Sequence, residues 1–471
     1  MDTIKPQLRR WDSDFFLNFF PTTTVIRRER SGKKSRCTKG FTRYVISNIS
    51  EDALYENATR VFREDPTRLF LHGCLSHGTQ IEVWVFTRTA IYRSGALDFE
   101  QLHFNQLMIL YENMCEYTLG ASQFVYTSRS GQSRIHVKGW LRIGSYLTDR
   151  PRTYSFILDK TPITCPDQIT SSQSICHRAT DFQQNAVVVK FSQRIDELQT
   201  EEKLLRRVTE RNLQGVAHLV DSRTFSWSNI NTSYVVITPM ARSIANYRSI
   251  PELLECFRDA IKAHHSLYKW GKILHRDISP GNIMITEPSN MFDRGPRGML
   301  IDFGLSLDLE DEQKAPHSIA GTKMFMAIDV LRNKTDSILP TYRHDLESFF
   351  YVFLYIAVCR DRTLPLNSRL LGWVRIENDW AEMGRQKRKD MADSWRFVAI
   401  MSEFAREFLH PELVKLAFKL RRLLFYPNGK FFVGTKDEVY MEQLYDSMVS
   451  AFEKALSGLS SGSSVPTGQS G

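Results

Sequence analysis

The 471-residue sequence has no long apolar stretch and few cysteines. Its longest apolar run, residues 349–359, is only 11 residues long, whereas a membrane-spanning helix needs about 20. The amino-terminal segment also lacks the apolar core of a secretory signal peptide. The seven cysteines are scattered and form no C-x-x-C pair, which argues against zinc and fits a reducing compartment. We therefore expect an intracellular protein, cytoplasmic or nuclear, without a membrane partner.

The composition is that of a folded chain, with 42% hydrophobic and 24% charged residues. The formal net charge of +9 favours acidic partners in general. Two basic clusters, residues 27–36 and 385–389, contribute to this charge. Each is interpreted first as a solvated loop or helix face, with a nuclear-import or nucleic-acid patch as the alternative. A nucleic-acid partner is therefore not expected.

The residues around Asp277 have the most informative spacing in the sequence. The H-R-D tripeptide at residues 275–277 is followed by Asn282, in the order H-R-D-x-x-x-x-N. A second apolar run then ends in D-F-G at residues 302–304. Two such signatures in this order indicate a phosphoryl-transfer site.

The chemistry of that transfer explains which residue types are needed. A protein must mainly position groups and stabilise charge, and one carboxylate must accept the proton of the acceptor hydroxyl. Asp277 is predicted to be that base. An amide and a second carboxylate must hold Mg²⁺ on the phosphates, and Asn282 and Asp302 offer oxygen ligands of this kind. The sequence therefore predicts a site for ATP and Mg²⁺.

Two upstream segments have the properties of a nucleotide-binding small lobe. Residues 186–190 form a β-branched run that ends in Lys190, which is predicted to hold the α- and β-phosphates. The helical stretch 196–208 offers Glu201 as the salt-bridge partner of that lysine, with Glu202 as the alternative.

A third segment is predicted to lead the chain between lobes. Residues 234–240 have the pattern of a strand that ends at proline. Pro239 and Met240 are expected to pair with adenine through their backbone. An ordinary buried strand with a proline stop is an alternative of equal weight.

Several further elements can be predicted from local patterns. Ser249 and Glu252 form a capping box that begins a helix ending at Gly271. Short apolar runs at 283–285 and 299–301 flank a Pro/Gly-rich segment and predict a β-hairpin. The other predicted elements are a strand at 80–86, a helical stretch at 99–111, a helix from 342 that is apolar all round, a helix at 411–424, and a disordered tail at 457–471.

Residues 321–329 stand where an activation segment should end. Met-Ala-Ile-Asp at 326–329 replaces the usual A-P-E, and Asp329 is expected to keep a carboxylate for an arginine partner. Asp345 lies near the start of the next predicted helix. One interpretation is that it simply favours the helix dipole, and a second follows from the resemblance described next.

The chain resembles the fungal-type protein kinases, a divergent branch of the protein-kinase-like fold. The resemblance rests on the wording H-R-D-I-S at 275–279 and D-L-E-S at 345–348, together with the D-F-G motif and Gly321-Thr322. It is most specific over residues 185–360 and weaker over 68–120.

This resemblance implies an α+β fold of the bilobal protein-kinase type, with a β-rich small lobe, a mainly helical large lobe and an N-terminal α/β extension. The implied boundaries are 1–150 for the extension or an elaborated small-lobe region, 151–240 for the small lobe, 241–456 for the large lobe and 457–471 for the tail. The implied activity is ATP-dependent phosphorylation of serine or threonine in an unidentified protein substrate.

The resemblance also implies roles for individual residues. Asp277 would be the base, and Asn282 and Asp302 would bind Mg²⁺. Lys190 would bind the phosphates, and Glu201 would hold that lysine in place. The implied structural or regulatory residues are His275, Arg276, Gly304, Thr322, Asp329 and Asp345.

Three of these have a specific implied contact. Asp345 would tie down the backbone of loop 275–282, and Thr322 would contact Asp277. Arg276 would be the counter-charge for a phosphorylated activation segment.

Two departures from the kinase pattern leave alternatives open. Residues 170–177 occupy the place of a G-x-G-x-x-G loop but contain no glycine, and glycines there let backbone amides approach phosphate closely. Ser279 replaces the lysine that many Ser/Thr kinases place two residues after the aspartate. A pseudokinase that acts as a binding scaffold is the first alternative. A small-molecule kinase of the aminoglycoside or choline type is the second, and the D-F-G motif and segment 321–329 argue against it.

Overall fold

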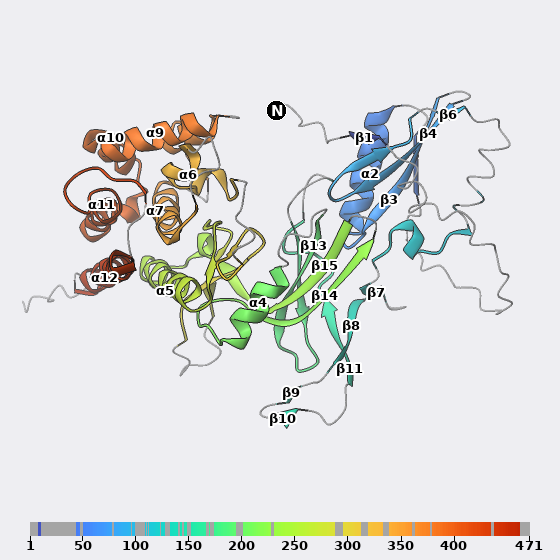
Figure 1. Ribbon diagram of the computed structural model, residues 1–471, viewed down its shortest axis with the longest axis horizontal. Coiled ribbons are helices and arrows are strands. Elements are labelled where there is room, and N and C mark those ends of the chain that lie inside the picture. Colours follow the sequence, from blue (N-terminus) through green and yellow to red (C-terminus); the bar gives the residue numbers. More distant parts are fainter. Residues whose placement is uncertain are drawn as a thin grey trace, which may run out of the picture. The chain divides into compact units, whose positions relative to one another are not determined.

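Helices and strands are both abundant in the computed structural model, so the fold is α+β (Figure 1). The chain divides into two units, one formed by residues 1–198 with 220–240 and the other by residues 199–219 with 241–471. The structure describes residues 8–10, 44–47 and 50–461, except for residues 78–79, 96, 99–108, 110, 112, 123, 128–131, 140–141, 144–145, 148–151, 166–168, 170–173, 195–200, 228–229, 288–294, 312–318, 333–338, 360–362, 377–378 and 435–437.

The first unit is mainly β-structure. Its elements are β1 (Leu8–Arg10), β2 (Tyr44–Ser47), α2 (Glu51–Glu64), β3 (Phe70–His77), β4 (Gln80–Thr87), β5 (Ile91–Arg93), β6 (Leu97–Asp98), the 3₁₀ turn η1 (Tyr117–Leu119), β7 (Val125–Thr127), β8 (Ser133–Gly139), β9 (Arg142–Ile143), β10 (Tyr146–Leu147), β11 (Arg152–Leu158), β12 (Ile175–Thr180), β13 (Ala186–Arg194), most of β14 (His218–Trp227) and β15 (Ile230–Thr238).

One part of this unit is a six-stranded sheet with helix α2 packed against it. The strand order is β1-β5-β4-β3-β2, with β6 paired to β4, and the β1–β5 and β2–β3 pairs are parallel. Helix α2 begins at Ser50, whose hydroxyl accepts from Ala53 N at 3.2 Å. Its buried residues Leu54, Ala58, Val61 and Phe62 recur at helical spacing and pack on β3 and β4. The predicted strand at 80–86 is confirmed by β4.

A seven-stranded sheet, in the order β14-β15-β13-β12-β11-β8-β7, completes the unit. Strand β13 confirms the strand predicted at 186–190, and β15 confirms the strand predicted at 234–240 as far as Thr238. Lys190 lies opposite Cys176 of β12 and Val235 of β15. Because side chains alternate along a strand, Lys190 is on the opposite face from Val189 and Phe191, which are in the sheet's apolar core.

The second unit is mainly helical. Its elements are α4 (Glu201–Glu210), β16 (Ala241–Ser243), η2 (Ile244–Asn246), α5 (Ile250–Lys269), β17 (Ile273–Leu274), β18 (Ile283–Thr286), β19 (Gly298–Leu300), β20 (Leu307–Asp308), η3 (Lys323–Phe325), α6 (Ile328–Arg332), α7 (Tyr342–Val358), α8 (Arg369–Val374), α9 (Trp380–Ala392), α10 (Ser394–Met401), η4 (Arg406–Leu409), α11 (Pro411–Phe425) and α12 (Glu438–Ser461).

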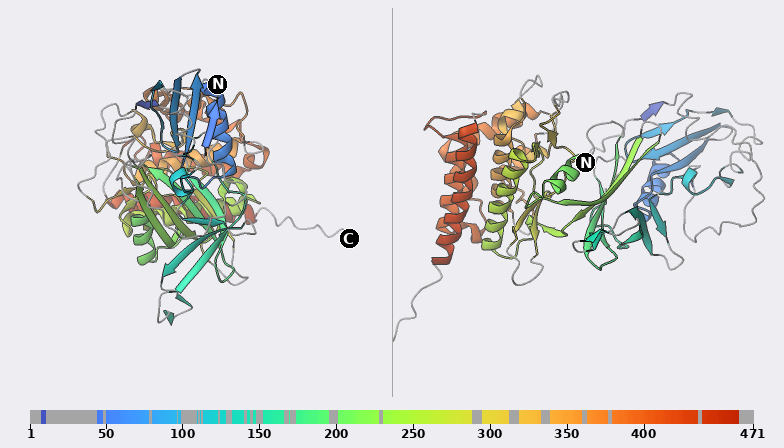
Figure 2. Two further views of the ribbon diagram at one scale, coloured as in Figure 1. Left: turned by 90° about the vertical axis from the view of Figure 1, so that its right-hand side faces the viewer. Right: turned by 60° about the horizontal axis from the view of Figure 1, so that its bottom comes forward.

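Helices α5 and α7 contribute many buried residues to the core of this unit. The predicted cap of α5 is confirmed, because the Ser249 hydroxyl accepts from Glu252 N at 3.3 Å. Helix α7 is buried on nearly all sides, as its apolar sequence predicts. Helices α5 and α12 lie side by side (Figure 2), where Phe257 stacks on Phe452 with ring centroids 5.4 Å apart.

The other local predictions have mixed outcomes. The hairpin is confirmed, since β18 and β19 are antiparallel with Ile283 opposite Leu300, and α11 confirms the helix predicted at 411–424. The predicted tail begins too early, because α12 continues to Ser461 with Leu459 half-buried on its inner side. Most of the stretch predicted to be helical at 99–111 lies outside the described residues. None of the described helices is both long enough and apolar enough to span a bilayer.

Candidate active site

Loop 275–282 joins β17 to β18 and carries Asp277 and Asn282. The side-chain amide of Asn282 donates to the carbonyl and to Oδ2 of Asp277, at 2.8 Å in both cases. A turn in which Asn282 N donates to the Ser279 carbonyl at 3.0 Å makes this approach geometrically easy. Because Nδ2 is committed to Asp277, a metal ion bound by Asn282 would contact its Oδ1.

Two hydrogen bonds join this loop to the strand that precedes D-F-G. Ile301 N donates to the Asn282 carbonyl at 3.1 Å, and His275 Nε2 lies 2.9 Å from the Ile301 carbonyl. The fully buried His275 ring also packs on Phe303, with centroids 5.6 Å apart. Two motifs that lie about 25 residues apart in sequence are therefore neighbours in the fold.

The backbone of the loop is held by Asp345 of α7. Asp345 Oδ2 accepts from His275 N and Arg276 N at 3.0 Å each, and from His264 Nε2 at 2.8 Å. Arg276 has φ +68°, a conformation in which both amides can point at one carboxylate. Burial alone raises the pKa of Asp345, but the hydrogen bonds from His264 and Arg276 N outweigh it and hold the pKa below its usual value.

Thr322 contacts Asp277 from the other side. Its backbone N and its Oγ1 both donate to Asp277 Oδ1, at 2.7 and 2.6 Å. Gly321 allows the approach, because it has φ +127° and an added Cβ would lie 2.7 Å from the Arg276 carbonyl oxygen. Asp277 thus accepts from Thr322 on one oxygen and from Asn282 on the other.

The D-F-G residues adopt a tight turn. Asp302 has φ +67°, and its Oδ1 accepts from Gly304 N at 3.1 Å. Phe303 N donates to Glu201 Oε1 of α4 at 3.2 Å. In the part of the chain that the structure describes, no three His, Cys, Asp or Glu side chains converge on a metal position. Asn282 and Asp302 are the candidate ligands near loop 275–282.

Three of the other predicted nucleotide-site residues belong to the first unit. Lys190 is buried in β13, and Pro239 and Met240 follow β15 directly. Glu201 lies in the second unit, so its predicted ion pair with Lys190 stays a prediction. Residues 170–173 of the glycine-free stretch lie outside the described residues.

The end of the segment after Thr322 is anchored differently from what the sequence suggested. An arginine partner was expected for Asp329, but the described contact of its carboxylate is with the His344 ring, whose Nε2 lies 4.0 Å away and whose pKa is lowered by burial. The nearby Arg343 instead pairs with Glu347 at 2.9 Å, one turn along the same helix. Glu347 also accepts from Ile328 N at 2.8 Å, so this carboxylate of α7 takes over the anchoring of the segment.

Sequence reasoning missed two buried charged groups of the second unit. Lys387 of α9 donates to the Met324 and Met326 carbonyls, and Asp308 of β20 accepts from Arg207 and Lys203 of α4. Helical spacing could have identified the lysine, because Lys387 continues a row of buried residues on α9. No local signal marks Asp308, whose partners lie about 100 residues away in sequence.

An open cavity of about 850 Å³ lies beside the loop. Loop 275–282 contributes Ser279 to its wall, and the segment after Thr322 contributes Phe325. Glu407 and Tyr247 bring polar groups to the same wall, and burial together with the nearby Glu407 raises the pKa of Tyr247 to about 12. The cavity could receive an extended segment of another molecule next to Asp277.

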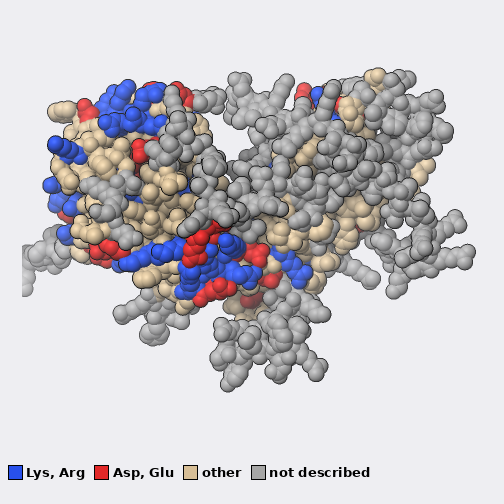
Figure 3. All heavy atoms as spheres, in the orientation of Figure 1, with Lys and Arg blue, Asp and Glu red and all other residues tan. Residues whose placement is uncertain are grey.

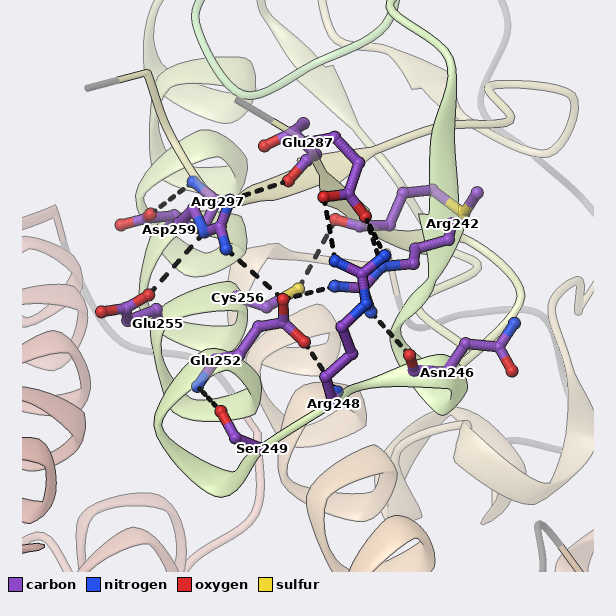
Figure 4. Close-up of polar contacts among 12 residues, drawn as sticks. Arg242, Asn246, Arg248, Ser249, Glu252, Glu255, Cys256, Asp259, Glu287 and Arg297 are labelled. Atoms are coloured by element: carbon purple, nitrogen blue, oxygen red, sulfur yellow. Dashed lines mark hydrogen bonds and ion pairs between the residues drawn. The ribbon is translucent and has the colours of Figure 1, made fainter. Parts of the chain in front are cut away.

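A charged network fixes the chain at the start of α5 (Figure 4). Glu252 accepts from Arg248 N at 2.7 Å and pairs with Arg242 of β16 and with Arg297. Arg242 Nε also donates to Glu287 at 2.8 Å. The network therefore joins β16 and α5 to Glu287 and Arg297, which stand directly after β18 and directly before β19.

Comparison with known proteins gives two results. A family model described as fungal protein kinase matches residues 47–234 and 223–357, well over half of the chain. A probable serine/threonine-protein kinase of Dictyostelium discoideum is 30% identical over 132 residues, which are 28% of this chain and 8% of that protein. The mouse serine/threonine-protein kinase Nek5 is 30% identical over 109 residues, 20% of this chain and 16% of Nek5. The chain thus spans only a small part of the length of these relatives.

Proposed function

Because the chain belongs to the fungal protein kinase family, we propose that it is an ATP-dependent protein serine/threonine kinase. The observation that carries the proposal is the set of contacts around Asp277, which accepts from Thr322 on one carboxylate oxygen and from Asn282 on the other. A carboxylate held in this way has a fixed direction, as a general base for a substrate hydroxyl requires.

The second unit offers residues that fit Mg²⁺ and the phosphates of ATP. Asn282 Oδ1 and the Asp302 carboxylate are hard oxygen donors. They are near each other in the chain's fold because Ile301, the residue before Asp302, donates its backbone N–H to the Asn282 carbonyl. Bound Mg-ATP would supply the phosphoryl group and neutralise the charge that develops on it. Asp277 would take the proton of the acceptor hydroxyl.

Residues of the first unit would complete the nucleotide site. Lys190 would contact the α- and β-phosphates, with Glu201 as its ion-pair partner, and the backbone of Pro239 and Met240 would contact adenine. In this proposal the chain has the two lobes of a bilobal kinase, and residues 199–219 of the small lobe belong to the second unit. Residues 151–240 and 241–456 would be the small and large lobes, and residues 1–150 an extension of the small lobe.

The cavity beside loop 275–282 is the proposed site for the protein substrate. It is lined by residues of that loop and of the segment that contacts Asp277, so a serine or threonine presented there would face the base. Its apolar lining includes Phe325, and Arg406 and Glu407 add one charge of each sign to the wall.

A pseudokinase that works as a binding scaffold is the second candidate. The observations that favour it are the missing glycines at residues 170–177 and the serine at position 279. Without close backbone amides the affinity for the phosphates would fall.

The first test is the melting temperature of the purified protein with and without millimolar Mg-ATP. Ligand at 100 times its dissociation constant stabilises a protein by about 2.7 kcal/mol, which is easily measured. We expect a shift for the wild type and none for Lys190→Ala or Asp302→Ala. If the wild type does not shift either, the ATP site is absent and the scaffold interpretation holds.

The second test separates binding from transfer. Asp277→Asn should keep the Mg-ATP shift and reduce phosphate transfer to a serine-containing protein by about 10²-fold or more. A wild-type protein that shifts with Mg-ATP but transfers no more phosphate than Asp277→Asn would be a nucleotide-binding pseudokinase.

A further inference from the structure

Lys387 is a lysine with no solvent-exposed surface. It lies in the middle of α9, on the same face as the buried Met383 and Met391. By contrast, Arg385 and Lys389 of the same helix are exposed, and Figure 3 shows basic side chains gathered over α9 and α10. The basic cluster at 385–389 was interpreted as a solvated face, and that interpretation is wrong for Lys387.

The ammonium group of Lys387 is fully enclosed by specific partners. Its Nζ donates to the Met324 carbonyl at 2.6 Å and to the Met326 carbonyl at 2.8 Å. It also lies 4.0 Å from the ring centroid of Tyr351 and 5.1 Å from that of Trp373. Two hydrogen bonds and two aromatic faces together replace the water that the buried amine has lost.

The aromatic partners are themselves held in place. The Tyr351 hydroxyl donates to Glu347 Oε1 at 2.8 Å, and Trp373 Nε1 donates to Asp390 Oδ2 at 2.8 Å. The same Glu347 oxygen accepts from Ile328 N. Segment 324–328 is therefore held at two places. Its carbonyls accept from Lys387, and its Ile328 amide donates to Glu347.

Close helix packing brings the lysine to this segment. Gly384, one turn before Lys387, lies against α6, where an added Cβ would be 2.6 Å from Arg332 and 3.1 Å from Leu331. A side chain at position 384 would push α9 away from α6. The glycine thus lets the amine reach the carbonyls.

Segment 324–328 contributes to the wall of the cavity beside loop 275–282. Phe325, between the two carbonyls, lines the cavity and packs at 90° on Tyr355, with ring centroids 5.4 Å apart. Thr322, three residues earlier, donates to Asp277. A movement of this segment would change both the cavity wall and the contacts of Asp277.

We propose that Lys387 is a positioning residue for the protein substrate, which acts by holding the Met324 and Met326 carbonyls so that Phe325 keeps its place in the cavity wall. The proposal rests on the proposed kinase function. Burial lowers the pKa of Lys387 to about 7, but a neutral amine still has two N–H groups. Both hydrogen bonds therefore persist on either side of that pKa.

The test compares Lys387→Met with Lys389→Met. The first variant keeps the length and apolar stem of the side chain but removes the donor, and the second removes an exposed charge from the same helix. Hydrogen–deuterium exchange of the amides at 322–328 should become about 10-fold faster in Lys387→Met and stay unchanged in Lys389→Met. The KM for a protein substrate should rise by about 10-fold or more in Lys387→Met, with the KM for ATP unchanged.

The exchange measurement needs no catalysis, so it separates failure of this inference from failure of the proposed kinase activity. Exchange at 322–328 that matches the wild type in Lys387→Met would overturn the inference. An equal acceleration over the whole second unit would also overturn it, since the lysine would then be merely structural. If Lys387→Met does not fold, Lys387→Gln takes its place with the same expected and contradicting outcomes, because its shorter side chain cannot reach both carbonyls.

Discussion

The side chain of Asp345 fixes the backbone of loop 275–282 from outside the loop. Its carboxylate accepts from His264 and from the backbone of His275 and Arg276. Removing it leaves three buried donors without their acceptor, and an unsatisfied buried donor costs about 1–3 kcal/mol.

We expect Asp345→Ala to lower the free energy of unfolding by about 3–5 kcal/mol, because several donors lose their acceptor at once. Urea denaturation followed by circular dichroism would measure it. Asp446→Ala, which changes an exposed aspartate of α12, is the control and should be neutral. A loss below about 1 kcal/mol for Asp345→Ala would show that other groups hold the loop.

At this scale the sequence was informative wherever a motif fixes the spacing. Asp277, Asn282 and Thr322 are in contact, as the H-R-D-x-x-x-x-N spacing and the family resemblance suggested. The role of Lys387 was not predicted, because the surrounding cluster of basic residues hides it. Its position between Met383 and Met391 on one helix face is the signal that could have separated it from Lys389.

A buried carboxylate is one of the groups that bind helix α4 to the rest of the second unit. Asp308 of β20 has almost no exposed surface and accepts from Arg207 at 2.6 and 2.7 Å and from Lys203 at 2.9 Å. Burial alone would raise the pKa of Asp308, but the hydrogen bonds from Arg207 and Lys203 prevail and hold that pKa far below its usual value.

The lowered pKa sets the direction of an acid dependence. The unfolded aspartate titrates near pH 3.9, so its stabilising effect is complete above about pH 4 and is lost as the pH falls toward the folded pKa. At pH 7, Asp308→Asn should lower the free energy of unfolding by about 3–5 kcal/mol. The difference between wild type and variant should then shrink as the pH is lowered from 4 to 2.

Denaturant titrations at several pH values would follow this difference. Glu310→Gln is the matched control, because Glu310 lies two residues away and pairs with Arg207 and Arg211 while exposed. An exposed pair contributes at most about 1 kcal/mol. A difference for Asp308→Asn that stays constant down to pH 2 would show that this carboxyl titrates alike in the folded and unfolded states, so that folding does not lower its pKa.

Local elements were predictable, and their long-range pairing was not. The hairpin of β18 and β19, the cap of α5 and the buried helix α7 follow from apolar spacing and end residues. The parallel pair β1–β5 brings together strands about 80 residues apart, and the pair β2–β3 joins the strands on either side of α2. No local pattern specifies such partners. The end of α12 was misplaced because serine and glycine were interpreted as tail residues.

The two units of the molecule are interleaved along the chain. The first unit is complete only when residues 220–240 have been added to residues 1–198. Strand β15 supplies the partner of β13 and the buried Tyr234 and Val236 of the sheet's core. A fragment that stops at residue 198 therefore lacks one of the two strands that pair with β13.

We expect a fragment of residues 1–198 to lack a cooperative thermal transition and to bind the dye ANS, as a chain with exposed apolar surface does. A fragment of residues 1–240 should melt cooperatively, because it contains β15. Circular dichroism and dye fluorescence on both fragments would test this. Cooperative melting of the shorter fragment would show that β15 is dispensable for the fold of the first unit.

The hydrogen bond between Arg207 and Asp308 spans 101 residues of sequence, and this separation has a consequence during synthesis on the ribosome. At about 5–20 residues per second, Asp308 is made roughly 5 to 20 seconds after Arg207. For that interval α4, which buries Leu204, Leu205 and Val208 in the finished protein, lacks this carboxylate. The packing of α4 in the second unit is therefore completed only after about 100 further residues have been synthesised.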